Sequence, residues 1–328
     1  MRHRRWSTLS WVVVAVFTIP ASVHAQIRQL TELSVTDIRA LDRRETVVII
    51  PGGLFEEHGP YLPAFTDGYT SEWLAGRVAE AIVTTGRPVV LFPVIPLGVG
   101  SPEDFGGRAP FPGSYTVRPS TLRAVYMDIA SALGRDGFRW IFVVHDHGSP
   151  SHNRVLIDAA EYFRDVFNGM MVPLSSYRYT TSSNRAPVWA PQEAEENAGD
   201  VHAGADETSR MLFLKPEIVD EDHRSAPPQT AAADGDLPTL AARPEWPGYF
   251  GSPRLARADA GATIMGRLAD DFADLALRVL DGFDPRNLPT RAATGDGAFK
   301  VLDDNLIRRS ESAESEQRKW LVGRGLVQ

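Results

Sequence analysis

The sequence contains no cysteine among its 328 residues. This absence excludes disulfide bonds and thiolate metal ligands. Any bound metal must therefore use oxygen and nitrogen donors, which suit zinc, manganese or magnesium better than copper(I) or iron–sulfur clusters. The chain also has no internal repeat.

Long hydrophobic runs are equally scarce. The one clear run, Leu9–Ala21, is shorter than the roughly 20 residues that a membrane-spanning helix needs. It follows three arginines and precedes the small residues of Val23-His24-Ala25, a pattern typical of a signal peptide cleaved before Gln26. We therefore expect residues 1–25 to direct export to the periplasm or medium, leaving a mature protein without stable membrane insertion. An uncleaved anchor is the alternative, and Arg4-Arg5 leaves the export route, general or twin-arginine, open.

Positive charge is also in short supply. The formal net charge is −8, and removal of residues 1–25 changes it to −11 because they contain three arginines and no acidic residue. The phosphates of a nucleic acid would repel such a protein, so a nucleic-acid partner is not expected. The mature length allows one large domain or two small ones.

Apolar segments typical of strands alternate with helical patterns from Val47 to about Phe167. The predicted strands are Val47–Ile50, Pro88–Leu97 and Trp140–Val144, and the predicted helices are Ser71–Val83, Thr121–Leu133 (closed by Gly134) and Asn153–Phe167. Continuous apolar strands between helices indicate a parallel sheet covered on both faces. We expect an α/β fold, a three-layer α/β/α sandwich with a mostly parallel sheet, whose ligands bind at the carboxyl ends of the strands.

The rest of the chain is less regular. The predicted loops are Ser101–Pro119, Thr180–Gly199 and His223–Pro244, and the predicted helices are Asp206–Leu214 and Ala262–Leu280. The polar Thr180–Gly199 segment is expected to be a mobile surface loop near the site. Residues 26–284 are predicted to form the folded domain, and residues 285–328 a loosely held polar tail with one helix at Glu311–Leu321.

Three polar clusters stand at the ends of predicted elements. Glu56–Pro63, followed by Thr66-Asp67-Gly68, comes directly after the first predicted strand. Val143–Ser149 closes the Trp140–Val144 strand, and Asp200–Ser209 places a histidine and a glutamate near the start of a short helix. Two strand ends and a helix start can converge on one crevice, where acid and imidazole side chains would form a divalent metal site. A solvated polar loop is the alternative for each cluster alone.

In combination these segments resemble the creatininase family. Glu56–Pro63 with Thr66-Asp67 is similar to its Glu-Gln-His-Gly-x-His-Leu-Pro and Thr-Asp signature, and His202–Gly204 with Glu207–Ser209 matches its His-Ala-Gly-x-x-Glu-Thr-Ser. Shorter likenesses are Phe111–Ser114, Gly137-Phe138, His147-Gly148, Gly251–Pro253, Ala256 and Gly261. The resemblance covers roughly Leu30 to Leu280.

The resemblance implies one or two divalent metals, zinc or manganese, and we expect two. Metal-ligand positions of the family are occupied by Glu56, His58, Asp67 and His147, with Asp67 at the position that bridges two metals; Glu207 matches a further carboxylate ligand. Such metals activate water at neutral pH, and His202 would move a proton to the departing nitrogen. The alternative for His202 is a hydrogen-bond partner outside the metal ligands. The family likeness also implies a homo-oligomer, often a hexamer.

Several residues depart from the family pattern. Glu57 replaces the usual Gln, Tyr61 replaces a His, and His145-Asp146 replaces Asn-Gly. Ser149 stands where creatininase proper has a metal-binding Glu, and Ala198-Gly199 stands where it has the Trp-Asp pair that helps to hold creatinine. Creatinine itself is therefore not the expected substrate. We expect His145 and Asp146 either to hold a metal ligand in place by a hydrogen bond or to lie at the surface.

These features predict an exported, metal-dependent amidohydrolase that acts on a small molecule. The expected substrate is a cyclic amide, in which the enzyme would cleave a carbon–nitrogen bond other than a peptide bond. Two alternatives remain. One is a hydrolase that opens a sugar-derived ketone or lactone ring. The other is a periplasmic binding protein that keeps the metal and the pocket without turnover; the retained His202 and Glu207 favour an enzyme.

Overall fold

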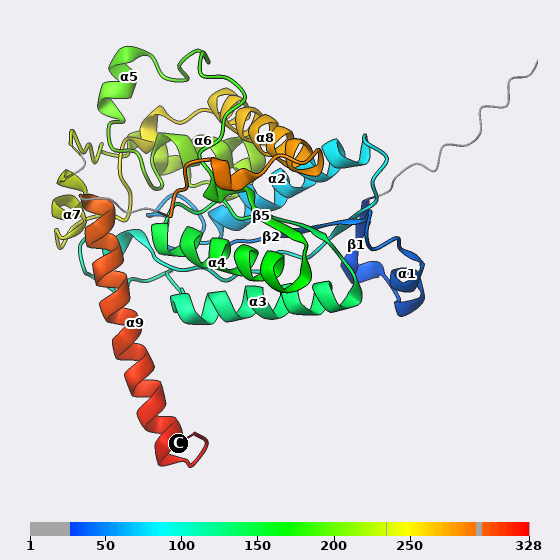
Figure 1. Ribbon diagram of the computed structural model, residues 1–328. Coiled ribbons are helices and arrows are strands. Elements are labelled where there is room, and N and C mark those ends of the chain that lie inside the picture. The colour runs from blue at the N-terminus through cyan, green and yellow to red at the C-terminus, as the bar shows by residue number, and fades with distance from the viewer. Residues whose placement is uncertain (1–26, 234, 293–296, 328) are drawn as a thin grey trace, which may run out of the picture.

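The computed structural model describes residues 27–233, 235–292 and 297–327. A five-stranded, fully parallel sheet lies between two layers of helices (Figure 1), which confirms the predicted three-layer α/β/α sandwich. The strand order is β1-β3-β2-β4-β5. The strands are β1 Ile27–Gln29, β2 Val47–Pro51, β3 Val89–Leu91, β4 Trp140–Val144 and β5 Met170–Pro173. The predicted signal peptide, residues 1–25, lies outside the described residues.

The two central strands are apolar throughout because helices cover both faces of the sheet. Val47 and Ile49 of β2 face the first core cluster, with α2 (Thr66–Val83) and α8 (Ala258–Leu280). Val48 and Ile50 face the second, with α3 (Pro119–Asp136) and α4 (Pro150–Phe167). This alternation follows from the two-residue period of a strand. Figure 1 shows α2, α8 and α6 (Ala205–Leu214) on one side of the sheet and α3 and α4 on the other.

Several boundaries differ from the predictions. The predicted strand Pro88–Leu97 is too long. The observed strand β3 ends at Leu91, because Pro93 and Pro96 interrupt strand pairing. Gly134 does not close α3; it lies inside the helix, where a Cβ would contact the ring of Phe167, and Gly137 ends the helix with a φ of 106°. The helices α2, α4 and α8 begin three to five residues earlier than predicted.

Short helices complete the fold. They are α1 Val35–Ala40, α5 Pro191–Glu196, α7 Asp236–Ala241, and the 3-10 turns η1 Leu30–Glu32, η2 Pro102–Asp104, η3 Leu174–Ser176, η4 Pro216–Ile218, η5 Glu221–Ser225, η6 Pro253–Leu255 and η7 Pro285–Asn287. Thus α5, α7 and η2 lie in segments predicted as loops. Within the described ranges, no helix combines the length and apolarity that crossing a membrane requires.

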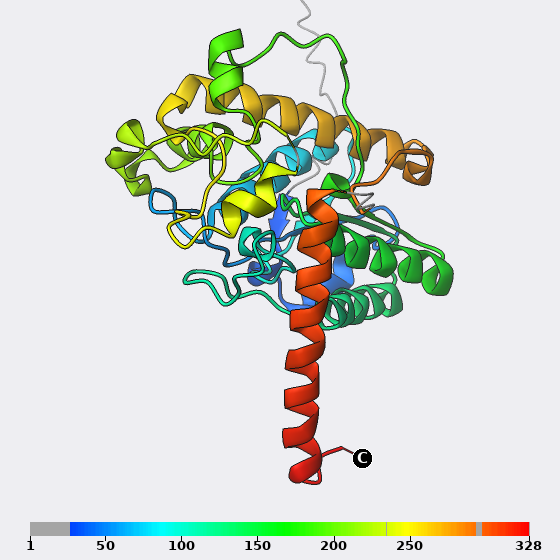
Figure 2. The ribbon, with the colours of Figure 1, turned by 90° about the vertical axis from the view of Figure 1, so that its left-hand side faces the viewer.

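The C-terminal segment corrects the prediction most strongly. One helix, α9 (Ala298–Gly323), extends the predicted Glu311–Leu321 helix by more than three turns toward the N-terminus. Its first half packs on the body, with Ala298, Leu302 and Leu306 buried at a four-residue spacing. A loosely held tail is therefore wrong for this half. Figure 2 shows the second half projecting away from the domain.

Candidate metal centre

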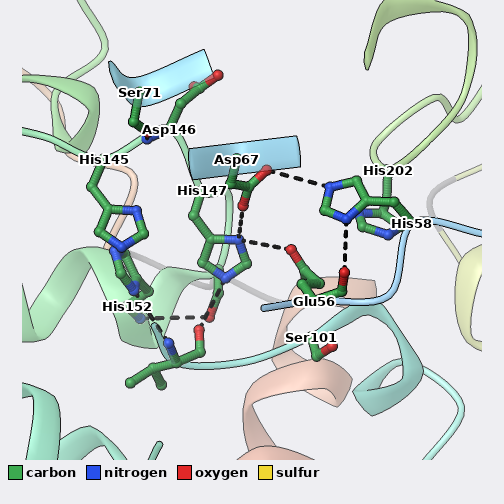
Figure 3. Close-up of polar contacts among 12 residues, drawn as sticks. Glu56, His58, Asp67, Ser71, Ser101, His145, Asp146, His147, His152 and His202 are labelled. Carbon is green, nitrogen blue, oxygen red and sulfur yellow. Dashed lines mark hydrogen bonds and ion pairs between the residues drawn. The ribbon is translucent and has the colours of Figure 1, made fainter. Parts of the chain in front are cut away.

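The site lies at the carboxyl ends of β2 and β4. These strands are neighbours in register, with Pro51 opposite Val144, so the segments that follow them leave the sheet side by side. The β2 segment carries Glu56 and His58, and the β4 segment carries His147. Asp67 lies in the first turn of α2. Figure 3 shows these side chains directed toward one another.

One group of ligands is formed by Glu56, Asp67 and His147, all buried. Nδ1 of His147 lies 3.1 Å from Oδ2 of Asp67 and 3.3 Å from Oε2 of Glu56. Glu56 and His147 come from the ends of two strands, as the sequence predicted, whereas Asp67 lies in the first turn of α2, which was predicted to begin only at Ser71. Two carboxylates and one imidazole around a common point are a ligand set for a divalent cation.

A second group consists of His58, Asp67 and Glu207. Nε2 of His58 lies 3.4 Å from Oδ1 of Asp67 and 3.7 Å from Oε2 of Glu207, which stands in the first turn of α6. Asp67 therefore offers Oδ2 to one group and Oδ1 to the other. Asp67 is therefore shared by both groups.

The hydrogen bonds of His147 and His58 show whether these side chains are suited to hold a cation. Nε2 of His147 lies 3.0 Å from the carbonyl oxygen of Val99, and Nδ1 of His58 lies 3.0 Å from that of Glu56. Because a carbonyl only accepts, each ring donates there and directs its other nitrogen at carboxylates. Nε2 of His58 is buried and has no hydrogen-bond partner among the residues that the structure describes. A lone pair facing carboxylate oxygens is repulsive unless a proton or metal cation lies between, so the residues fit a divalent cation.

The pKa values of the ligands agree with a cation site. Burial, partly offset by His147, raises the pKa of Glu56 to about 7. Burial alone would also raise the pKa of Asp67, but contacts from His147 and His58 hold it well below its usual value. Burial would lower the pKa of His58, yet Asp67 and Glu207 raise it to about 10. The surplus of buried carboxylate charge thus attracts positive charge to the site.

His202 lies beside the second group. Its Nε2 donates to the carbonyl oxygen of Glu57 at 2.6 Å, and its ring centre lies 4.3 Å from that of His58. Burial and the nearby His58 hold the pKa of His202 well below its usual value. The ring is therefore neutral, with Nδ1 free to accept a proton 3.8 Å from Oε2 of Glu207. Glu56, His58 and His202 also have potential ligand atoms within 4.8 Å of one another, so geometry leaves a ligand role open for His202.

The ligands open onto a small cavity of about 50 Å³. Glu56, Asp67, His147, His202 and Glu207 line one part of it. The remaining lining is largely apolar and comes from Pro102, Phe105, Val201, Phe299 and Leu302, with Ser101, Gly148 and Ser149. Sequence reasoning missed this apolar lining, because it comes from a loop and from the predicted tail.

The residues that depart from the family pattern take structural positions. His145 is fully buried, so a surface position is wrong for it; its Nε2 bonds to the carbonyl of Leu97 at 3.1 Å. Asp146 forms a 2.8 Å ion pair with Arg210 of α6, and its backbone N–H donates to Ser71 of α2. These contacts tie the end of β4 to the helices that carry Asp67 and Glu207.

Three other departures, Glu57, Tyr61 and Ser149, also make defined contacts. Glu57 is buried and accepts a hydrogen bond from the backbone of Gly59 at 2.9 Å. Tyr61 packs against Tyr249, with ring centres 5.9 Å apart. Ser149 caps the start of α4. None of the three is among the clustered ligand atoms of the described residues.

Comparisons with known proteins agree with this geometry. The family described as "Creatininase: Creatinine amidohydrolase" matches residues 31–276. The creatinine amidohydrolase of Pseudomonas putida is 28% identical over 70% of this chain and 88% of its own. The mycofactocin precursor peptide peptidase of Mycolicibacterium smegmatis is 26% identical over 77% of this chain and 94% of its own. A solved structure described as "Creatininase Mn" shares the fold, with a TM-score of 0.57 and 23% identity, covering 77% of this chain and 99% of that one.

Proposed function

The chain belongs to the creatininase family of metal-dependent hydrolases, and we propose that it cleaves a carbon–nitrogen bond other than a peptide bond, in a cyclic amide. The observation that carries the proposal is the position of Asp67, whose two oxygens face two separate ligand groups beside a neutral His202. The cavity next to these groups is small, which suits a compact ring.

Zinc or manganese, when held by Glu56, His58, Asp67, His147 and Glu207, would supply Lewis acidity that lowers the pKa of water and polarises an amide carbonyl. The neutral His202 accepts a proton from the attacking water at Nδ1 and transfers it to the departing nitrogen. A carbon–oxygen bond forms and the carbon–nitrogen bond of the ring breaks, so that a single ring-opened product carries both the new carboxylate and the new amine. The bond from Nε2 to the carbonyl of Glu57 keeps the ring in the required tautomer.

The mycobacterial relative gives a specific reason to consider a peptide substrate, because it is named a peptide peptidase and aligns over most of its length. An extended peptide needs an open groove on both sides of the reacting carbonyl. The cavity of about 50 Å³, bounded by Phe105, Phe299 and Leu302, favours a compact substrate instead.

An activity panel tests the proposal. Purified protein loaded with zinc or manganese would be assayed with hydantoin and 5-oxoproline as cyclic amides, glucono-1,5-lactone as a sugar-derived ring, and a tetrapeptide amide. Metal-dependent release of a new carboxylate from a cyclic amide supports the proposal. Turnover of the lactone or the peptide alone would contradict it, and no turnover together with tight metal binding would favour the binding protein.

Export and assembly complete the proposal. The basic start, apolar run and small residues of 1–25 support export with cleavage before Gln26. Mass spectrometry of the protein recovered from a periplasmic extract would test the cleavage position. The homo-oligomer, often a hexamer in the family, stays a prediction that light scattering of the mature protein would test.

A further inference from the structure

The cavity beside the metal centre receives two side chains from outside the part of the chain that matches the family. The match ends at residue 276, and α9 begins at Ala298. Even so, Phe299 and Leu302 of α9 line the same cavity as Glu56. A segment added after the family domain therefore helps to shape the candidate active site.

The position of α9 against this cavity is held by specific polar contacts. Arg309 forms a paired contact with the carboxylate of Asp104, with Nη2–Oδ2 at 2.7 Å and Nε–Oδ1 at 3.1 Å. Asp104 is only 1% exposed. Asn305 donates to the carbonyl of Asp104 at 2.6 Å. These bonds fasten α9 to η2, the turn whose Pro102 also lines the cavity.

Apolar packing fixes the orientation of the two lining residues. The ring of Phe299 lies 5.3 Å from that of Phe105, which in turn contacts Phe250 at 5.7 Å. Leu302 is 4% exposed and belongs to the same cluster. The two side chains therefore present a fixed surface rather than a flexible one to whatever enters the cavity.

We propose that Phe299 and Leu302 determine substrate specificity, as an apolar wall that admits a compact substrate with an apolar face and rejects bulky or extended ones. This inference rests on the proposed function, because it assumes that the metal centre holds the reacting end of the substrate. A hydrophobic pocket discriminates by size when added atoms would overlap with its wall.

Truncation of the wall tests the proposal through binding, without a known substrate. Hydroxamates bind divalent metals in hydrolases, and acetohydroxamate and benzohydroxamate differ only by a methyl group against a phenyl ring. We expect the zinc-loaded wild-type protein to bind acetohydroxamate more tightly than benzohydroxamate. In Phe299→Ala and Leu302→Ala, benzohydroxamate affinity should rise about tenfold relative to wild type, while acetohydroxamate affinity changes less than about threefold.

Controls on the same helix separate the wall from a general effect of α9. Val301 and Ile307 are 39% and 43% exposed, so Val301→Ala and Ile307→Ala should leave both affinities unchanged. Phe299→Leu, which keeps bulk, should restore most of the wild-type preference. Melting temperature and zinc content of each variant show whether it is folded and loaded.

The outcomes separate the two claims. If folded, zinc-loaded Phe299→Ala and Leu302→Ala keep the wild-type ratio of acetohydroxamate to benzohydroxamate affinity, the specificity proposal is wrong while the metal centre is unaffected. Equal loss of both hydroxamates in these variants also overturns it, because the helix would then only support the fold. A wild type that binds neither zinc nor acetohydroxamate overturns the proposed function, and this inference falls with it.

Discussion

His202 and Glu57 are joined by a hydrogen bond across 145 positions of the chain, from Nε2 of the ring to the backbone carbonyl at 2.6 Å. The bond links the segment before α6 to the segment after β2 and fixes the neutral tautomer of His202. It leaves Nδ1 as the proton acceptor beside the metal ligands. A ring held in this way can carry a proton without being a ligand itself.

The His202→Ala variant should therefore lose activity while keeping its metal. We expect kcat to fall about 10²- to 10⁴-fold, the range for loss of a general acid–base group. Elemental analysis should give the wild-type metal content. His223→Ala, which removes a buried histidine that does not line the cavity, is the matched control. Loss of metal in the His202 variant would instead assign this residue to the ligands.

Metal binding should release protons at neutral pH. Asp67 and Glu207 outweigh burial and raise the pKa of His58 to about 10, and Glu56 and Asp67 likewise raise the pKa of His147 well above its usual value. Both rings are then protonated in the metal-free protein at pH 7.5. Binding through Nε2 of His58 and Nδ1 of His147 must displace these two protons, and Glu56, whose pKa is raised to about 7, releases a further fraction of a proton.

Calorimetric titration of zinc into metal-free protein, in buffers of different ionisation enthalpy, measures that number. Affinity should rise with pH up to about 10, because fewer protons then compete with the metal. A titration with no proton release, or an affinity that falls as pH rises over this range, would contradict the placement of these imidazoles in the ligand groups.

Two glycines of α8 should respond in opposite ways to alanine. A Cβ on Gly261 would lie 1.9 Å from the carbonyl oxygen of Ser209 on α6, whereas a Cβ on Gly266 would meet no atom of the described residues within 4 Å. Gly261→Ala should destabilise the protein by about 1–3 kcal/mol or more. Gly266→Ala should stabilise it by about 1 kcal/mol, the gain in helix propensity.

Thermal or denaturant unfolding of the two variants checks this pair. Since α6 carries Glu207, Gly261→Ala should also weaken metal binding, and Gly266→Ala should not. Equal effects of the two substitutions would mean that α6 and α8 do not approach as closely as described.

The ion pair between Asp146 and Arg210 should matter for stability as well as for the site. Both side chains are largely buried, and they join the end of β4 to α6 at 2.8 Å. Arg210→Met leaves the carboxylate without its partner, which should cost about 3 kcal/mol. The double variant Arg210→Met/Asp146→Asn should recover part of that loss. Denaturant unfolding at pH 7 measures both, and a fully additive double variant would show that the two residues do not interact.

Much of the fold was predictable because its central strands carry a strong signal. Val47–Pro51 and Trp140–Val144 are continuous apolar runs followed by acid and imidazole groups, so both the parallel sheet and the ligand positions could be inferred. The edge strands β1 and β5 have only three and four residues, too few to establish a period.

The apolar wall of the cavity was not predictable in the same way. Most of α9 is polar and exposed, which conceals the four-residue spacing of Ala298, Leu302 and Leu306. That spacing is the one signal that could have revealed a packed helix. It could not have indicated that Phe299 and Leu302 reach the site, because that depends on the long-range contact between Arg309 and Asp104.

Metal content of the purified protein shows whether Asp67 holds the metals as proposed. Elemental analysis would compare wild type, Asp67→Ala and Glu72→Ala, the last an exposed acid on the same helix. We expect about two equivalents of zinc or manganese in wild type and in Glu72→Ala, and their loss in Asp67→Ala, because one carboxylate serves both ligand groups. Full metal content in Asp67→Ala, or none in reconstituted wild type, would contradict this expectation.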